Sequence, residues 1–113
     1  MVKLIVVNKR KPGTTQEEFN RAWRNHGRLI LSTPEFVRHM RKYVQCYPVP
    51  SSIQLPTDAE IGGISELWFD SVEDLSKLVQ EPCIPEITMP DTVKFIDFEN
   101  SPNFLVEEVL VQG

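Results

Sequence analysis

Apolar side chains occupy both alternating faces of the first segment of the chain, residues 2–9, which is rich in β-branched residues. A strand with two apolar faces is typical of a strand that is covered on both sides. Alternation with a period of two predicts further strands at 38–47 and 63–70, and an apolar run predicts a last strand at 104–111. The first, third and fourth of these strands are apolar on both faces.

Two stretches with helical periodicity lie between the predicted strands. Thr15 followed by Glu18 has the spacing of a capping box, and the helix that it opens is expected to run to about residue 33, because a proline follows. A second helix is expected to begin directly after the third strand, with Asp70 as its cap and Glu73 three positions on. Proline-containing segments at 48–61 and 80–90 are read as a long loop and a covering segment, with one short helical turn near 91–95.

The resulting order of strand, helix, strand, strand, helix, strand predicts an α+β fold. It is the ferredoxin-like βαββαβ layout, an antiparallel sheet with two helices on one face. A chain of 113 residues forms one domain, spanning 1–113.

Two helices cover only one face of a four-stranded sheet, so the second apolar face needs another partner. The simplest cover is the same face of a second copy of the chain, because a large exposed apolar face promotes aggregation in a monomer. We therefore expect a homodimer that packs sheet against sheet and forms a barrel-like sandwich with a cavity.

Composition narrows the list of partners. Twelve basic and 16 acidic residues give a net charge of −4, and the only basic run is 9–11, which argues against a nucleic-acid or anionic-membrane surface. Cys46 and Cys83 lack the spacing of a zinc site or a disulfide framework and are read as reduced thiols. The apolar run 4–7 is too short for a signal peptide or a membrane span, so a cytoplasmic protein is expected.

His26 is the first candidate for chemistry. On a helical wheel that starts at Phe19, Trp23 falls at about 40° and His26 at about 340°, so the imidazole belongs to the apolar stripe. Histidine exchanges a proton near neutral pH, and an inward-facing one beside a cavity is a candidate general acid or base. The alternative is a core histidine bonded to a backbone carbonyl.

Glu66 is the second candidate, since its neighbours on the same strand face are Ile64 and Trp68. Partial burial between bulky apolar groups favours the protonated acid, which suits proton transfer, unless a cation pairs with the carboxylate. The alternative is an ion pair with Arg41 or Lys94 at a sheet edge.

Aromatic residues complete the predicted site. Tyr43 and Tyr47 share a strand face, and their hydroxyls could bind an enolate or carbonyl oxygen, although Tyr47 is equally well explained as filling of the barrel. Trp23 and Trp68 are expected to form walls against which a substrate stacks. His39, near the start of its strand, is expected to face solvent.

Four segments in a characteristic order extend over most of the chain. They are VVNKRKPG at 6–13, EF at 18–19 with WRNHG at 23–27, ELWFDS at 66–71, and Asp91 with FID at 95–97. Together they resemble the EthD family of small dimeric α/β-barrel proteins. One departure is Arg28, where members often have proline after the His–Gly pair, and it places a cation near the cavity or its rim.

The resemblance implies that His26 and Gly27 lie beside a mostly apolar cavity. It also implies a fold similar to cofactor-free lactone isomerases, polyketide cyclases and dehydratases, and quinone-forming monooxygenases. We therefore expect acid–base chemistry of the lyase or isomerase type, with neither cofactor nor metal, on a small hydrophobic metabolite with a carbonyl group. His26 would move the proton, and Tyr43 or Glu66 would stabilise the charge that develops. The alternatives are a cofactor-free oxidoreductase and a non-catalytic dimer that binds a hydrophobic metabolite or assists an oxidative pathway.

Overall fold

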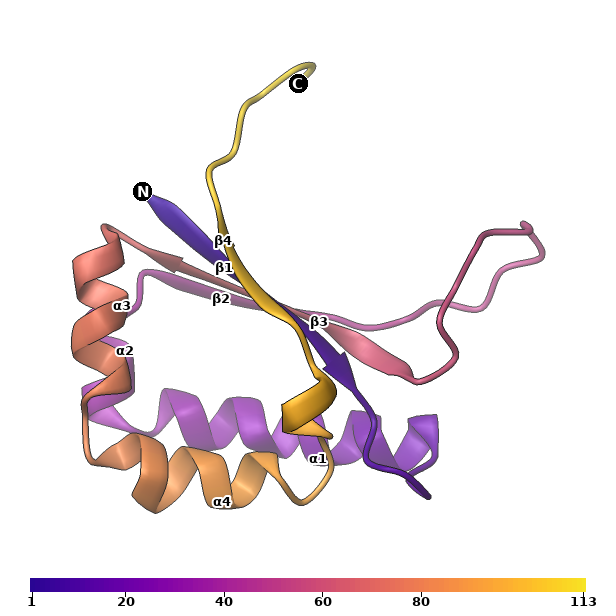
Figure 1. The fold of residues 1–113 in the computed structure, drawn as a ribbon, viewed down its shortest axis with the longest axis horizontal. Coiled ribbons are helices and arrows are strands. Elements are labelled where there is room, and N and C mark those ends of the chain that lie inside the picture. The colour runs from indigo at the N-terminus through magenta and orange to yellow at the C-terminus, as the bar shows by residue number, and fades with distance from the viewer.

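A single four-stranded antiparallel sheet forms the centre of the computed structural model, which describes all residues from 1 to 113 (Figure 1). The strands are β1 (Val2–Lys9), β2 (Lys42–Cys46), β3 (Ile61–Phe69) and β4 (Asn103–Val106). Their order in the sheet is β2-β3-β1-β4, and each neighbouring pair is antiparallel. This confirms the predicted ferredoxin-like α+β fold.

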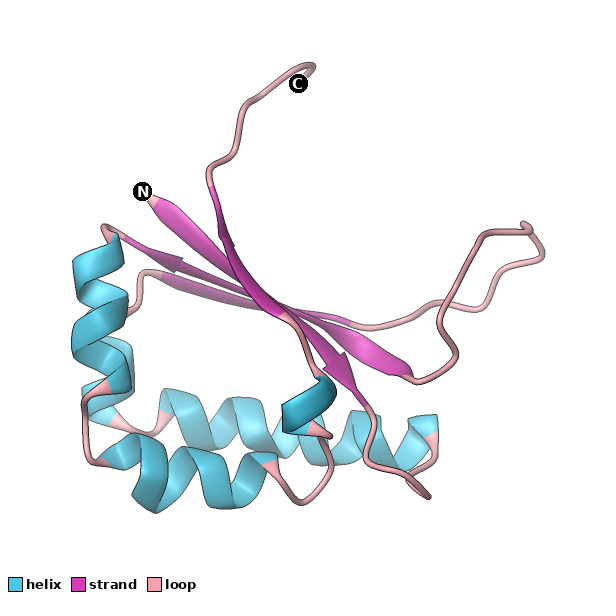
Figure 2. Cartoon of the chain, viewed as in Figure 1, coloured by secondary structure: helices cyan, strands magenta, loops and turns pink.

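The helices gather on one face of the sheet, as Figure 2 shows. They are α1 (Gln16–Leu31), α2 (Pro34–His39), α3 (Val72–Val79) and α4 (Met89–Thr92), with a π-helical turn (Ile84–Thr88) and a 3₁₀ turn (Phe98–Asn100). No helix of the structure is long and apolar enough to cross a membrane. The prediction that both main helices, α1 and α3, cover the same face is correct.

The start of α1 follows the predicted capping box. The Thr15 hydroxyl accepts a hydrogen bond from the Glu18 backbone N–H at 3.1 Å, and the Glu18 carboxylate accepts one from the Thr15 N–H at 3.0 Å. These bonds lower the pKa of Glu18, because they favour its charged form. The capping box therefore fixes where α1 begins and which residues form its inner face.

The segment after α1 differs from the prediction. Residues 34–39 form α2, so positions 38 and 39 belong to a helix and not to the predicted strand, because proline suits the first turn of a helix and Thr33 before it is extended. His39 is consequently on a helix and half-buried, 3.7 Å from Glu81, and the expectation that it faces solvent is wrong. Strand β2 begins only at Lys42 and ends at Cys46.

Two further boundaries of secondary-structure elements differ from the prediction by a few residues. Ser71, not Asp70, caps α3, since its hydroxyl accepts a hydrogen bond from the Asp74 N–H. Asp70 instead receives two hydrogen bonds from Arg41, which lower the pKa of that carboxyl group. The last strand ends at Val106, and residues 107–113 are exposed and outside the sheet.

Close contact between α1 and β3 depends on glycine. Phe19 and Trp23 are 0% and 1% exposed, and their rings occupy the space that side chains at 62 and 63 would need. A Cβ on Gly63 would overlap the indole of Trp23, and one on Gly62 would overlap the ring of Phe19. The two glycines thus let the helix approach the sheet closely and set the depth of its inner stripe.

The opposite face of the sheet, here called the outer face, has no helix over it (Figure 2). Its side chains come from alternate positions of the four strands, as the cross-strand register shows. Apolar members of this face are Ile5, Val7, Val44, Ile64, Phe104 and Val106. Phe104 is 49% exposed, so within one chain this apolar surface remains partly open to solvent.

Candidate active site

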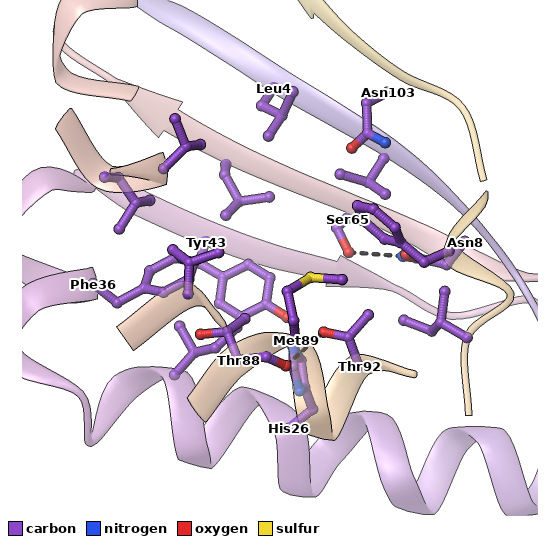
Figure 3. Close-up of a pocket in the computed structure, with 18 of the residues that line it drawn as sticks. Leu4, Asn8, His26, Phe36, Tyr43, Ser65, Thr88, Met89, Thr92 and Asn103 are labelled. Atoms are coloured by element: carbon purple, nitrogen blue, oxygen red, sulfur yellow. Dashed lines mark hydrogen bonds between the residues drawn. The ribbon is translucent and has the colours of Figure 1, made fainter. Parts of the chain in front are cut away.

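A cavity of about 220 Å³ lies between the sheet, α1 and the segment that contains α3 and α4 (Figure 3). Fifteen of its 21 lining residues are hydrophobic, and none of the 21 is Asp, Glu, Lys or Arg. The six other residues at its wall are Asn8, His26, Ser65, Thr88, Thr92 and Asn103, and Tyr43, counted among the hydrophobic residues, adds a hydroxyl group. A mostly apolar hollow with a few polar groups is the usual form of a small-molecule site.

His26 projects from the inner face of α1 and is 5% exposed. Its Nδ1 lies 2.7 Å from Oδ2 of Asp91, a residue of α4. Because a carboxylate only accepts hydrogen bonds, this contact places the ring proton on Nδ1. Nε2 makes no hydrogen bond within the chain and is the ring atom that remains available to a molecule in the cavity.

Asp91 is in turn held on its other oxygen, since Nζ of Lys94 lies 3.6 Å from Oδ1. The carboxylate is only partly buried, with 26% of its side chain exposed, so it also contacts solvent. The Phe95 ring packs edge-on against the imidazole, with 5.6 Å between ring centroids. His26 is therefore oriented by a hydrogen bond and by packing together.

The Tyr43 hydroxyl lies at the cavity wall and is held by Gln45. The Gln45 amide donates to the Tyr43 oxygen at 2.9 Å and to the Trp23 carbonyl at 2.9 Å, and it accepts from Tyr47 at 2.6 Å. Burial raises the pKa of Tyr43, while hydrogen-bonding groups around the hydroxyl offset part of that effect. The phenol therefore stays protonated and able to donate at neutral pH.

Gly27, next to His26, leaves room for this arrangement. A Cβ there would lie 3.0 Å from the amide nitrogen of Gln45. A side chain at this position would push the amide away from Tyr43 and Trp23. Packing against Gln45 therefore explains why a glycine follows His26.

The six residues expected in the site fall into three groups. His26, Trp23 and Tyr43 line the cavity together. Tyr47 lies behind them and does not line it, because its ring packs on Trp23 with 4.7 Å between centroids. Its role is to bond Gln45, which agrees with the alternative that it fills the barrel.

The last two expected residues, Glu66 and Trp68, lie on the outer face. Glu66 pairs with Lys3 at 3.2 Å, so the alternative of an ion pair holds, although the partner is neither Arg41 nor Lys94. Trp68 lies between the ammonium groups of Lys3 and Lys42, 4.8 and 4.6 Å from the ring centroid. The sheet separates both residues from His26.

Two residues of the site were not singled out from the sequence. Asp91 is 65 positions from His26 and was noted only in the short turn at 91–95 and in the family-like segment. Gln45 alternates with Tyr43 and Tyr47 in the strand predicted at 38–47, but glutamine carries no signal of its own. A search for an acid able to orient His26 would have had 16 candidates.

Arg28 does not reach the cavity. It is exposed in the last turn of α1, donates to Asn25 at 3.1 Å, and lines a separate groove between α1 and β2. The helix continues through this position to Leu31. The chain brings together no group of three or more His, Cys, Asp or Glu side chains suited to holding a metal ion.

Comparison with known proteins identifies similar folds. A family model described as the EthD domain matches residues 11–99. No curated protein matches the sequence significantly. An ethyl tert-butyl ether D family protein from Bacillus halodurans has a TM-score of 0.66 at 20% identity, over 96% of this chain and 99% of that chain.

Two other solved structures are similar over nearly the full length. A dimeric protein of ferredoxin-like fold from Bacteroides fragilis has a TM-score of 0.68 at 15% identity, over 95% of each chain. SnoaB, described as a cofactor-independent oxygenase from Streptomyces nogalater, has a TM-score of 0.60 at 8% identity, over 98% of this chain and 97% of that chain. At these identities the similarity shows the fold and leaves the chemistry to the residues of the site.

Proposed function

Because the chain belongs to the EthD domain family, we propose that it is a cofactor-free enzyme that performs acid–base chemistry on a small, neutral, hydrophobic carbonyl compound. One observation carries the proposal: an imidazole, oriented by Asp91 at 2.7 Å, stands in the wall of an otherwise mostly apolar cavity. A base of this kind needs a fixed tautomer and a free nitrogen, and His26 has both.

In the proposed step, Nε2 of His26 takes a proton from the carbon next to the substrate carbonyl. The electron pair of that C–H bond forms a carbon–carbon double bond, and the carbonyl oxygen becomes an enolate oxygen. Asp91 stabilises the imidazolium that forms, and the Tyr43 hydroxyl donates to the enolate oxygen. Return of the proton to another carbon gives isomerisation, and its transfer to a departing hydroxyl group gives dehydration. Attack of the enolate carbon on a second carbonyl gives cyclisation.

The cavity supports a small neutral substrate. None of the lining residues carries a permanent charge, so an ionised substrate would lose its hydration without a compensating partner. The volume of about 220 Å³ lies below the range of about 300–1,000 Å³ that is common for drug-sized ligands. One or two rings with a carbonyl group, as in an aromatic, lactone or polyketide-like compound, match these limits.

We also propose that the protein forms a homodimer through the outer face, as one domain of a dimeric α/β barrel. The uncovered apolar side chains of the four strands support this, because a surface of this kind is usually buried against a partner. The cavity lies on the helical side of the sheet, so a second copy on the outer face would stabilise the sheet from the side opposite the cavity.

The test of catalysis is deuterium exchange at the carbons next to the carbonyl of 2-tetralone, followed by NMR in D₂O. We expect exchange by the wild-type protein above the buffer rate and a loss of about 10²- to 10⁴-fold in His26→Ala. Glu66→Gln, on the outer face, is the control and should exchange at the wild-type rate. Equal exchange by wild type and His26→Ala would refute the assignment of His26 as the base.

A binding protein for hydrophobic metabolites is the second candidate, favoured by the fifteen hydrophobic residues in the cavity wall. It predicts that 2-tetralone binds but that no exchange occurs.

A cofactor-free oxygenase, as in the description of SnoaB, is a variant of the proposed enzyme. It would add dioxygen to the enolate, and oxygen uptake that depends on substrate would distinguish it.

A further inference from the structure

Three polar side chains form a row across the inner face of the sheet, on the neighbouring strands β1, β3 and β2. Asn8 and Ser65 are 3% and 7% exposed, and the Asn8 amide nitrogen donates to the Ser65 hydroxyl oxygen at 2.8 Å (Figure 3). The Ser65 hydroxyl in turn hydrogen-bonds the Tyr43 hydroxyl. The row therefore connects a buried amide, for which the proposed reaction has no use, to the group that would bind the carbonyl oxygen of the substrate.

Every group of the chain that hydrogen-bonds the Tyr43 oxygen is a donor. The Gln45 amide nitrogen lies 2.9 Å away, and the Ser65 hydroxyl and the Trp23 indole N–H bond to the same oxygen. Amide and indole nitrogens only donate, so neither can accept the proton of the phenol. As long as Ser65 also donates, that proton has no acceptor within the chain and is available to a molecule in the cavity.

Ser65 is the member of this set whose role can change, because a hydroxyl both donates and accepts. Asn8 decides its direction. While the amide N–H donates to the Ser65 oxygen, the proton of Ser65 is free to point to Tyr43. With an acceptor in place of that amide, Ser65 would donate to position 8 instead. It would then accept the proton of Tyr43, which would turn away from the cavity.

We propose that Asn8 and Ser65 are positioning residues that direct the proton of the Tyr43 hydroxyl to the carbonyl oxygen of the substrate. The inference rests on the proposed function for the identity of the reacting group. A donor that already points to the oxygen needs no reorientation while negative charge develops there, which is how preorganised donors stabilise an oxyanion. The inference thus extends the site from Tyr43 across the sheet to β1.

The test reverses the row by a substitution of the same size, Asn8→Asp. A carboxylate only accepts hydrogen bonds, whereas a protonated acid donates as the amide does. Because burial in an apolar wall favours the protonated acid, the measurements run from about pH 5 to about pH 9. The probe is 2-tetralone labelled with ¹³C at its carbonyl carbon. Difference infrared spectroscopy reports the carbonyl stretching band of the bound probe, which moves to lower wavenumber when the oxygen accepts a hydrogen bond.

The expected result is a band that depends on the direction of the row. In the wild-type protein we expect the lowered wavenumber, and Tyr43→Phe should remove this shift because the donor is gone. Asn8→Asp should keep the shift at low pH and lose it at high pH. At high pH its 2-tetralone exchange should also fall about 10- to 100-fold, as the loss of a hydrogen bond to a charged oxygen allows. Asn25→Asp, at an exposed asparagine on α1, is the matched control and should behave as wild type at every pH.

A second substitution tests whether Ser65 transmits the effect. Ser65→Ala alone removes one donor, so it should move the band slightly to higher wavenumber and reduce exchange about 2- to 5-fold. Added to Asn8→Asp, it removes the acceptor for the Tyr43 proton, so the band at high pH should return to its position in Ser65→Ala. Thermal unfolding of each variant checks that it is folded. If Asn8→Asp does not fold, Ser65→Ala decides, and an unchanged band would then refute the inference.

The outcomes separate this inference from the proposed function. It is refuted if wild type shows no bound or no shifted band, or if the shift survives in Tyr43→Phe. It is also refuted if Asn8→Asp matches Asn25→Asp at every pH, or if adding Ser65→Ala does not restore the band.

The infrared band does not require the base, so His26→Ala should keep the wild-type shift. If the band behaves as expected while exchange is equal in wild type and His26→Ala, the positioning of Tyr43 stands and the catalytic proposal fails. If exchange depends on His26 while the band does not respond to position 8, the proposed function stands without this inference.

Discussion

The inner and outer faces of the sheet both combine apolar side chains with polar ones, but the polar groups are used differently. On the outer face, Lys3 contacts Glu66 at 3.2 Å and Glu108 at 3.8 Å, and Glu108 also accepts from the Trp68 indole at 2.8 Å. On the inner side, where α1 covers the sheet and encloses the cavity, the Nε2 of His26 on α1 and the amide oxygen of Asn8 on β1 have no partner within the chain.

This difference between the two sides of the sheet indicates where a ligand is expected to bind. Polar groups that saturate one another stabilise the surface on which they lie, and they have little left to offer a small molecule. Polar groups that are oriented by one bond and left with a free position can bind or react. Burial alone does not distinguish the two faces, since Glu66 and Tyr43 are both half-buried.

The largest expected effect is on assembly. Ile64→Asp places a carboxylate in the middle of the outer face, and we expect the dimer dissociation constant to rise about 100- to 1,000-fold, because an unpaired charge would be buried. Analytical ultracentrifugation measures it. Leu31→Asp, on the helical side, is the control with an unchanged constant. An unaltered dimer in Ile64→Asp would contradict the assignment of this face, whereas unchanged binding of 2-tetralone would sharpen the separation of the two faces.

The next effect concerns the inner face alone. Asp91→Asn removes the carboxylate that orients His26, and we expect 2-tetralone exchange to fall about 10- to 100-fold, because the imidazole loses its fixed tautomer. Lys94→Ala, which removes the outer partner of Asp91, should change the rate by about twofold or less. NMR exchange rates decide this, and a wild-type rate in Asp91→Asn would reduce Asp91 to a structural role.

A stability measurement tests the contact on which the inner face depends. Gly63→Ala forces a methyl group into the space of the Trp23 ring, and we expect a loss of about 1–3 kcal/mol in the free energy of unfolding. Urea denaturation measures the loss. Gly113→Ala, at the exposed C-terminus, should change the value by less than about 0.5 kcal/mol. Equal stability of Gly63→Ala and wild type would show that α1 can move away from the sheet without cost.

The smallest effect is the pH dependence from Tyr43. Burial raises the pKa of this phenol above its ordinary value of 10.0, so the folded state holds the proton more firmly than the unfolded state. Its contribution to stability is complete below pH 10 and is lost as the pH rises through the folded-state pKa. Tyr43→Phe should therefore lose less stability than wild type between pH 9 and 11 in urea denaturation. Parallel curves for the two proteins would contradict the buried phenol.

The fold could be predicted largely from local patterns, whereas the site could be predicted only in part. Alternation and the capping box identify elements because their causes lie within a few residues. Which face of the sheet a candidate residue lies on depends on the register of the strands. Tyr43 pairs with Leu67 and Val44 pairs with Glu66, so the side chains of Tyr43 and Glu66 lie on opposite faces. No local pattern contains that information.

Asp91 was out of reach for a related reason. Asp91 and His26 are 65 residues apart and lie on two different helices, so their contact forms only after the chain has packed around the cavity. The short helix α2 was missed because six residues make fewer than two helical turns, which is too short for a periodic apolar stripe to be recognised. The position of His26, by contrast, followed from the stripe of α1 alone.

The order of strands in the sheet has a consequence for how the chain is made. Every strand pair joins one member from before the 48–60 loop to one from after it, because β1 pairs with β3 and β4 and β2 pairs with β3. Neither half of the chain therefore contains a ladder of its own. During synthesis the first half of the chain cannot form any part of the sheet until β3 has left the ribosome. A cut within the loop would leave two fragments that form the sheet only by pairing with each other.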